Sequence, residues 1–535
     1  MEKLRPNSER KFFADYIPQE FSPEQEKILN PFFSNLDGPI YVIHDLPETV
    51  AASLIARQSQ TTFAPRELFI QEYLTDESLS LEWVRNRGEL GLSQFVDIAK
   101  AEDLYNRIFV GWHHEQLAKL VDIFIGIEGV SQVGTKYMED GRYVRPLERS
   151  TRYGRFHLVD ARGRYRYARE PRIMASQYGQ LYCETTDRLI EANAELIEEA
   201  IPLLRIKYPG WDGKQIRNRA FDLCRVLLPA SILTNLGIVV NGLTAEYRSA
   251  KLQSSGLAEP QEIGRMIQEE VGKIYPSLMA RFEDDFGKDM IRYQRETREG
   301  MELLTEEIIP AFEPIRGPRV ELTDYDPEGE IKVIAEILWE YGDERPKEQI
   351  RESVRRMNWE EKVRIFDRYI GERKNLKQKP GRALEATSYN FVIRAPFEIF
   401  RDLDRHSVLT KYRHDFTFDH GWTMEKELAE LNPEFERFVR EETEKAMETF
   451  YLIREILPKE AQYMTTFGAL TAWSVIGNFR EFLYIPEFRT GEGRHPGYQR
   501  VAQMIYELIK EVHPILSRAY KFVDMGGEKE WVTSK

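Results

Sequence analysis

Two stretches far apart in the chain share one pattern: Ile40-Tyr-Val-Ile-His-Asp-Leu-Pro-Glu48 and Val320-Glu-Leu-Thr-Asp-Tyr-Asp-Pro-Glu328. Each predicts a short strand followed by a proline turn. The runs that follow them, Thr49–Arg57 and Glu330–Tyr341, have apolar residues at helical spacing. A strand, turn and helix that recur in this way indicate an internal duplication.

Two further landmarks recur in the same order. Cys224-Arg-Val-Leu-Leu-Pro229 corresponds to Ile453-Arg-Glu-Ile-Leu-Pro458, and each is preceded by an apolar strand, at 121–127 and 389–394. The sequence therefore predicts two diverged copies of one unit. The alternative is that these are features which any two unrelated α/β segments share.

The proposed copies occupy residues 40–315 and 318–535, behind an N-terminal extension at 1–39. The junction between them, Pro314-Ile-Arg-Gly-Pro318, has the residues expected of a linker. The first copy is longer, partly because of a predicted hairpin at 155–169. The surrounding segment 152–174 is basic and aromatic, so it is interpreted as a family-specific insertion or a lid, with a nucleic-acid surface as the alternative.

Composition restricts the class of protein. The chain has 535 residues, of which 42% are hydrophobic and 31% charged, which is typical of a soluble chain of two to four domains. The formal net charge of −14 argues against a general nucleic-acid coat or an anionic-membrane binder, but it leaves room for a local basic pocket. The most apolar stretch, Val226–Val240, is too short to span a bilayer.

The cysteines and histidines give little support for metal or disulfide chemistry. Only Cys183 and Cys224 are present, so a disulfide framework is excluded and a cytoplasmic location is expected. None of the nine histidines belongs to an H-E-x-x-H motif. No metal site is predicted.

Arginine-rich segments follow the two central strands. In the first half Asp140-Gly-Arg142 leads to Leu147-Glu-Arg-Ser-Thr-Arg-Tyr153, and in the second half Arg405-His406 stands at the corresponding place. Together with the R-x-x-L-P motif and the long helices, this order resembles the flavin-dependent thymidylate synthases, or thymidylate synthase complementing proteins. Their signature is R-H-R-x-x-S-x-N-x-x-S-x-R.

Each half retains a different part of that signature. The first half keeps Arg142 and the closing E-x-S-x-R, which we call the nucleotide limb (residues 148–152). The second half keeps the leading Arg-His, but Arg413, Asp415 and Thr417 replace the closing residues. The resemblance thus implies two copies that have specialised, with one composite site between them.

The later family pattern adds residues on the second long helix. Asn478, Arg480 and Arg489 match it, and with Arg405-His406 they form what we call the flavin limb. Matching Arg454 to the family's R-x-x-L-P arginine requires an eight-residue insertion, so another register stays open. Asn478 and Arg480 diverge by about 200° on an ideal helix, which predicts different ligands for the two.

The residue types suit phosphate and base recognition. Guanidinium groups of Arg152 and Arg225 and the hydroxyl of Ser150 are candidate phosphate donors, and Glu148 is a candidate acceptor for the base or ribose. The alternative is that these arginines form ordinary surface ion pairs. The resemblance assigns Arg142 and Arg489 to catalysis. It assigns cofactor binding to five residues: His114, Arg405, His406, Asn478 and Arg480.

The resemblance implies an α+β fold made of two tandem thymidylate synthase-like copies, each with a mixed sheet and long packed helices, related by a pseudo-twofold axis. The implied activity is FAD-dependent methylation of deoxyuridine monophosphate to thymidine monophosphate, or a related pyrimidine-nucleotide reaction. NADPH and methylenetetrahydrofolate are the implied co-substrates, and a homodimer would stand in for the family tetramer. The alternative is a non-catalytic nucleotide- or nucleic-acid-binding paralogue.

Overall fold

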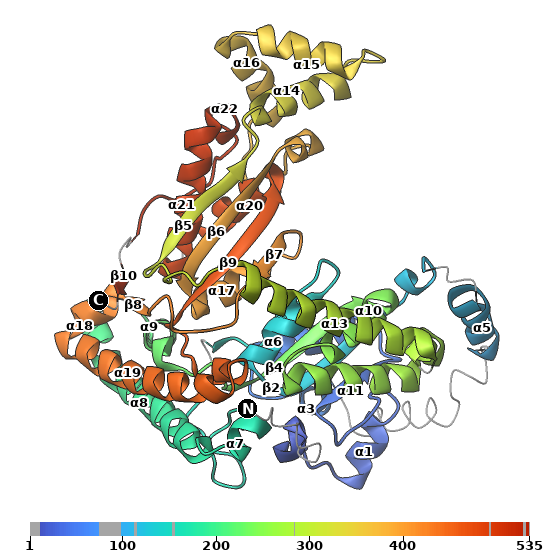
Figure 1. The fold of residues 1–535 in the computed structure, drawn as a ribbon, viewed down its shortest axis with the longest axis vertical. Coiled ribbons are helices and arrows are strands. Elements are labelled where there is room, and N and C mark those ends of the chain that lie inside the picture. Colours follow the sequence, from blue (N-terminus) through green and yellow to red (C-terminus); the bar gives the residue numbers. More distant parts are fainter. Residues whose placement is uncertain are drawn as a thin grey trace.

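The computed structural model describes residues 11–73, 98–111, 115–151, 156–282, 284–491, 494–527 and 531–533. Helices surround two separate four-stranded sheets, one in each half of the chain, so the fold is α+β (Figure 1). In the part of the chain that is described, none of the helices combines the length and the apolar character that a bilayer crossing requires.

The two sheets have the same strand order. The first sheet has the order β1 (Ile40–Ile43), β2 (Asp122–Ser131), β4 (Leu233–Asn241), β3 (Arg145–Glu148). The second has the order β5 (Arg319–Tyr325), β6 (Ser388–Pro396), β9 (Leu470–Asn478), β7 (Thr410–Arg413). All the described pairs in these sheets are antiparallel, not mixed as expected, because the last strand of each unit inserts between two strands that run opposite to it.

In both halves helices follow the first, second and last strands of the sheet, whereas the helices before the last strand differ in number and length. In the first half they are α2 (Glu48–Gln58), α6 (Gln132–Glu139), α8 (Gly179–Lys207), α9 (Gly213–Cys224), α10 (Gly242–Gln253) and α11 (Ala258–Ile274). In the second they are α14 (Gly329–Glu340), α17 (Phe397–Leu403), α18 (Lys426–Leu431), α19 (Pro433–Ile456), α20 (Phe479–Arg489) and α21 (Pro496–Val512). The predicted strand–turn–helix at the start of each copy is therefore confirmed.

The segment 425–450 forms two helices with one interruption. Asn432 has extended backbone and its side chain accepts a hydrogen bond from the Glu434 amide at 3.1 Å, which caps the start of α19. Pro433 occupies the first helical position, where its missing N–H costs nothing. The segment therefore forms two helices, α18 and α19.

Some elements occur in one half only. The second half adds α15 (Lys347–Arg356) and α16 (Trp359–Ile370), which with α14 project from the far end of its sheet (Figure 1). The first half ends in α13 (Asp285–Ile308), and residues 310–318 between it and β5 have no helix or strand. The predicted hairpin turns at Asp160, whose amide donates to the Arg164 carbonyl at 2.8 Å, but its arms form isolated bridges and no longer strands.

One hydrophobic cluster spans the two halves. It includes Leu196 of α8, Leu227 and, from the second half, Phe450 of α19 and Phe467. The helices α8 and α19 also contact each other through polar groups, because the Thr185 and Thr449 hydroxyl oxygens lie 3.0 Å apart. Two further clusters pack on the first-half sheet, one with α10 and α11 and one with α2, so this half also has cores of its own.

Backbone hydrogen bonds join the halves where their polypeptides cross. The Phe467 amide donates to the Leu228 carbonyl at 2.8 Å, and the Ala230 amide donates to the Thr465 carbonyl at 2.7 Å. Pro229 and Thr466 form the bridge between these bonds. This crossing fixes the position of one half relative to the other.

Gly468 allows the close approach at this crossing. An added Cβ there would lie 2.4 Å from Val226 Cγ2 and 2.9 Å from the Thr423 carbonyl oxygen. We expect Gly468→Ala to lower the free energy of unfolding by about 1–3 kcal/mol, the usual cost of overpacking. Differential scanning calorimetry of the purified variant measures it.

The matched control is Gly300→Ala on the exposed surface of α13, where an added Cβ meets nothing within 4 Å. This control is expected to stabilise the protein slightly, because alanine is a better helix former than glycine. Equal effects of the two substitutions would contradict the tight crossing.

Candidate functional site

The nucleotide limb and the α17 segment of the second half meet in the interior of the protein. The Glu148 carboxylate, at the end of β3, accepts a hydrogen bond from Arg401 Nη2 on α17 at 2.7 Å. Lys136 Nζ of α6 lies 3.3 Å from the other carboxylate oxygen. Glu148, Arg401 and Lys136 are all nearly inaccessible to solvent. The juxtaposition predicted for the two halves therefore occurs within one chain.

Local structure explains this placement. The strand β3 lies at the edge of its sheet, so its last residue, Glu148, points into the space where the second half packs. Phe397 and Phe400 bury one side of α17, where the Phe397 ring packs on Phe416 at 4.4 Å between centroids. The Arg401 guanidinium lies over the Phe467 ring at 5.1 Å.

Arg225 is the second buried arginine of the site. It follows α9, and its Nε donates to Glu398 Oε2 at 2.8 Å, while Nη2 lies 3.8 Å from Asp402 Oδ2. The Thr151 hydroxyl accepts from Arg225 Nη1 at 3.3 Å and from Arg401 Nη1 at 3.4 Å. Thr151 thus connects the nucleotide limb with both guanidinium groups.

The retained Arg-His pair lies beside the same cluster. Arg405 Nη2 is 3.9 Å from Asp402 Oδ1. Arg489, at the end of α20, donates from Nε to His406 Nε2 at 3.0 Å and from Nη2 to the Asp402 carbonyl. Four of the predicted residues, Arg225, Arg405, His406 and Arg489, therefore converge around Asp402.

The basic groups of the site keep its carboxylates ionised. Burial raises the pKa of Glu148, but Arg401 and Lys136 outweigh it and hold that pKa at about 2. Burial likewise raises the pKa of Asp402, and Arg405 and Arg225 bring it to about 2. Burial lowers the pKa of His406 to about 3, helped by Arg489, so its ring is neutral and accepts the Arg489 hydrogen bond.

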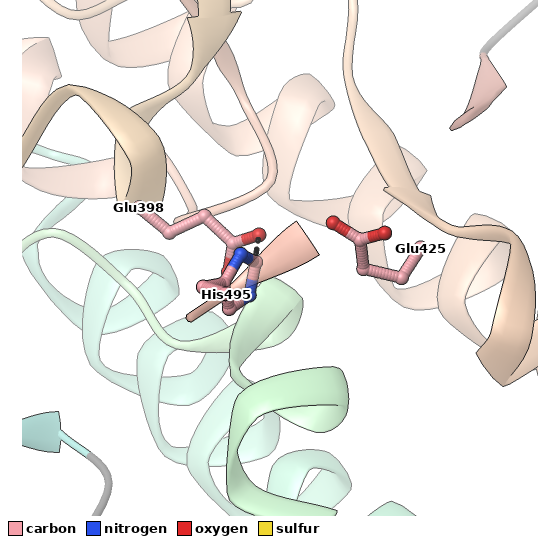
Figure 2. A group of neighbouring side chains, drawn as sticks. All are labelled: Glu398, Glu425 and His495. Atoms are coloured by element: carbon pink, nitrogen blue, oxygen red, sulfur yellow. Dashed lines mark ion pairs between the residues drawn. The ribbon is translucent and has the colours of Figure 1, made fainter. Parts of the chain in front are cut away.

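A second buried group, Glu398, Glu425 and His495, adjoins Arg225 through Glu398. Figure 2 shows the His495 ring against the Glu398 carboxylate, with Glu425 facing them. Their possible ligand atoms lie within 4.8 Å of one another. However, Arg225 binds Glu398, and Arg500 Nη2 donates to both Glu425 oxygens at 2.7 and 2.6 Å. Two fixed guanidinium charges argue against a divalent cation here, and the group acts as an ion-pair network that holds Arg225.

Other predicted residues lie elsewhere. Asn478 caps α20 by accepting from the Glu481 amide at 3.1 Å, and Arg480 donates to the Pro380 carbonyl and to Glu385 at the same end of that helix. Arg142 is exposed and donates to Thr410 Oγ1 at 2.8 Å. The Ser150 amide donates to the Ser59 carbonyl. His114 and Arg152 lie outside the described residues.

The structure also decides the register of the second copy. The strands β4 and β9 both have nine residues and end at a capping asparagine, Asn241 or Asn478. Counting back sixteen residues from each leads to Arg225 in the first half and to Gln462 in the second. Arg454 is therefore not the counterpart of Arg225; it lies on α19 and binds Asp419 at 2.6 Å.

Sequence reasoning missed three members of the site: Arg401 and Thr151, which are buried, and Asp402, which is half-buried. Arg401 stands four residues before Arg405, and a pair at this spacing shares one helix face. This spacing alone could have placed Arg401 beside Arg405 in the candidate site. Arg401 is not part of the family motif, however, so the motif did not predict it.

The basic and aromatic segment after the nucleotide limb is packed against the protein. Tyr167 is buried and lies beneath the Arg169 guanidinium at 4.2 Å, and Tyr165 donates to Glu191 at 3.2 Å. Arg162 forms an ion pair with Asp15 at 3.2 Å. These internal partners favour the interpretation as a structural insertion over a surface that stacks bases.

Comparison with known proteins identifies the family. A family model described as thymidylate synthase complementing protein matches residues 55–277 and 321–515. The chain is 31% identical over 520 residues to a UPF0159 protein of Chlamydia pneumoniae, covering 95% of this chain and 96% of the relative. A UPF0159 protein of Thermoplasma acidophilum is 29% identical over 464 residues, covering 80% and 90%.

The chain belongs to the thymidylate synthase complementing protein family, and the family model recurs in both halves. Among solved structures, a UMP/dUMP methylase, PolB from Streptomyces cacaoi bound with 5-Br dUMP, aligns with a TM-score of 0.31 and 15% identity. The alignment covers 39% of this chain and 97% of that one.

The low pKa of Glu148 leads to a test by pH. Its charged form is stabilised in the folded state, so this contribution is complete above the unfolded pKa of about 4.5 and is lost as the pH falls toward 2. We expect Glu148→Gln to be less stable at pH 7 by about 3–5 kcal/mol, because Arg401 and Lys136 lose their shared partner. Its stability should then fall less than that of the wild type between pH 4.5 and 3 in urea unfolding.

The control for this experiment is Glu434→Gln, which removes an exposed carboxylate on α19 that pairs with Arg437. This variant should follow the wild-type profile closely, since exposed pairs contribute little. Parallel profiles for Glu148→Gln and the wild type would contradict the assignment.

Proposed function

We propose that the protein is a flavin-dependent enzyme that methylates deoxyuridine monophosphate to thymidine monophosphate, or carries out a closely related pyrimidine-nucleotide reaction. The observation that carries this proposal is the buried contact between Glu148 of the nucleotide limb and Arg401 of the second half, at 2.7 Å. It supports a composite site made by two specialised copies.

The copies are taken as residues 40–315 and 318–535, related by a pseudo-twofold axis. The shared strand order supports this, as does the crossing at Pro229 and Thr466, each of which lies twelve residues before its capping asparagine. Two such chains in a homodimer would then correspond to the four units of the family tetramer.

For the substrate, Arg225 and Arg401 are the proposed phosphate or base donors. Ser150 of the nucleotide limb is a further proposed donor, as is Arg152, which lies outside the described residues. The buried nitrogens Arg225 Nη2 and Arg401 Nε make no hydrogen bond within the described residues. Unused buried donors of this kind fit an anionic ligand, because an acceptor there would remove their desolvation cost. The Glu148 carboxylate, ionised by its basic neighbours, is the proposed acceptor for the base.

For the cofactor, Arg405, His406 and Arg489 would hold FAD near the nucleotide. When bound, the flavin supplies the hydride chemistry of this family. Arginines and carboxylates surround this region and hold one another in place, so the protein provides fixed charges there; they are Arg225, Arg401, Arg405, Arg489, Glu148, Asp402 and Glu398. Asn478 and Arg480, at the other end of α20, would contact a separate part of the cofactor, and NADPH and methylenetetrahydrofolate are the proposed co-substrates.

A second candidate is a non-catalytic nucleotide-binding paralogue. It is favoured by the position of Arg142, which is exposed and bound to Thr410 instead of joining the buried arginines. The visible absorbance spectrum of the purified protein distinguishes the two, because only the flavoprotein absorbs in the visible range.

The cofactor assignment predicts flavin loss in one double variant. Arg405→Ala together with His406→Ala should release FAD and abolish turnover, because two of the proposed cofactor contacts and one ion-pair partner of Asp402 are removed. The flavin-to-protein ratio after gel filtration measures this, with circular dichroism as the test of folding.

The exposed Arg437→Ala variant on α19 serves as the charge-matched control and should retain its flavin. A wild-type protein that cannot be loaded with FAD would reject the cofactor assignment and support the paralogue.

The substrate assignment predicts a difference between two arginines that stand in the same sequence motif. Arg225→Lys should weaken binding of deoxyuridine monophosphate about tenfold to a hundredfold, because lysine cannot replace the several donors of a buried guanidinium. Arg454→Lys should leave the affinity unchanged, because Arg454, which lies on α19, forms an ion pair with Asp419. Isothermal titration calorimetry measures the affinity of both variants. Equal losses of affinity would contradict the assignment of the substrate to the composite site.

A further inference from the structure

A cavity of about 610 Å³ lies between the two halves; Asp402 is not in its lining, but Lys136, which contacts Glu148, borders both this cavity and the candidate site. Its walls come from α6 and α10 of the first half and from α17 and β7 of the second. Residues of α13, the long helix found only in the first half, complete the lining. The cavity size is within the range of small-molecule sites.

This cavity is the counterpart of the proposed active site, with the roles of the halves exchanged. Glu148 is the last residue of β3 and pairs with Leu236. Arg413 is the last residue of β7 and pairs with Trp473 at the equivalent place, so an arginine stands where the other half has a carboxylate. Counting from the capping asparagines, Leu252 of α10 stands where Arg489 does. The proposed base acceptor and one proposed cofactor contact therefore have no equivalent at this counterpart.

The cavity is positively charged although the chain has a net charge of −14. Its lining includes seven basic side chains and four acidic ones. The basic ones are Lys136, Arg248, Lys251, Arg298, Lys411, Arg413 and Lys459, and the acidic ones are Asp140, Glu302, Asp404 and Asp415. An excess of three positive charges in a concave site attracts anions.

The basic groups at the α13 side are gathered around one carboxylate. Glu302 Oε1 lies 3.3 Å from Arg298 Nη1 and 2.5 Å from Lys459 Nζ. Gly256 makes room for both, because an added Cβ there would lie 3.1 Å from each of these two nitrogens. On the α10 wall, Arg248 is buried and its Nε makes no hydrogen bond within the described residues. A phosphate chain could replace the Glu302 carboxylate between Arg298 and Lys459.

Aromatic side chains share the lining with these cations. Tyr137, Tyr247, Tyr293, Tyr412 and Trp473 line the cavity, and the Arg413 guanidinium lies over the Tyr137 ring at 4.8 Å. Tyr293 and Tyr412 are mostly exposed, at 70% and 64%, so their ring faces are open to a ligand. Rings and guanidinium planes of this kind stack on nucleobases.

From these features we infer that the cavity is a second ligand site that binds a nucleoside triphosphate without transforming it. Its phosphates would contact Arg298 and Lys459 beside α13, and its base would lie among the tyrosines near Arg413. This goes beyond the proposed reaction, which uses the opposite pairing of the two halves. It also gives α13 a function, since this helix contributes both polar and aromatic groups to the site.

The test is isothermal titration calorimetry with adenosine triphosphate and with uridine triphosphate, followed by variants titrated with the tighter of the two. The double variant Arg298→Gln with Lys459→Gln should raise the dissociation constant at least tenfold, as should Arg413→Gln on the opposite wall. The control Arg356→Gln, on the exposed face of α15, should change it less than twofold. If Arg413→Gln fails to fold, the double variant at the partly exposed Arg298 and Lys459 tests the proposal by itself.

Inorganic tripolyphosphate and uridine are titrated in parallel. Both should bind more weakly than the nucleotide, because each makes only part of the contacts. Three results would overturn the proposal: no binding of either nucleotide at millimolar concentration, equal affinity for tripolyphosphate, or unchanged affinity in the cavity variants.

Discussion

The structure depends on a carboxylate from one half of the chain and a guanidinium from the other that neutralise each other out of contact with water. Glu148 and Arg401 are both buried and pair across the two halves, while Lys136 contacts Glu148 from within the first half. Removing one partner of such a pair usually costs about 3–5 kcal/mol. The ion pair therefore makes a precise relative position of the two halves a condition of folding, and the crossing at Pro229 and Thr466 provides that position.

The same requirement organises the site. Arg225 is held by Glu398, and Asp402 lies between Arg225, Arg405 and Arg489. Because these groups are fixed by one another, they need not reorganise when a ligand arrives, which is how preorganised charges act in catalysis and binding. Buried network members such as Glu398 and Glu425 thus orient the arginines that the proposed ligand would contact.

Sequence patterns predicted the elements that depend on local chemistry. The proline turns, the strands after them and the helices α2 and α14 follow from periodicity and capping, and the family motif located Glu148, Arg225, Arg405 and Arg489. The motif misplaced Arg454, because a local R-x-x-L-P pattern carries no information on the sheet register that decides equivalence. Arg401 and Thr151 were missed because their importance comes only from contacts between the halves. Asn478 matched the motif, and the structure shows it acting as a helix cap.

The exchange of Glu148 for Arg413 at equivalent ends of β3 and β7 has a consequence for how the gene can change. Tandem copies in one gene are prone to homogenisation, in which one copy overwrites the other. Here, copying the second segment onto the first would replace the carboxylate that binds Arg401 with an arginine, so two like charges would lie together in the interior. The buried ion pair therefore penalises a return of the two segments to one sequence at this position.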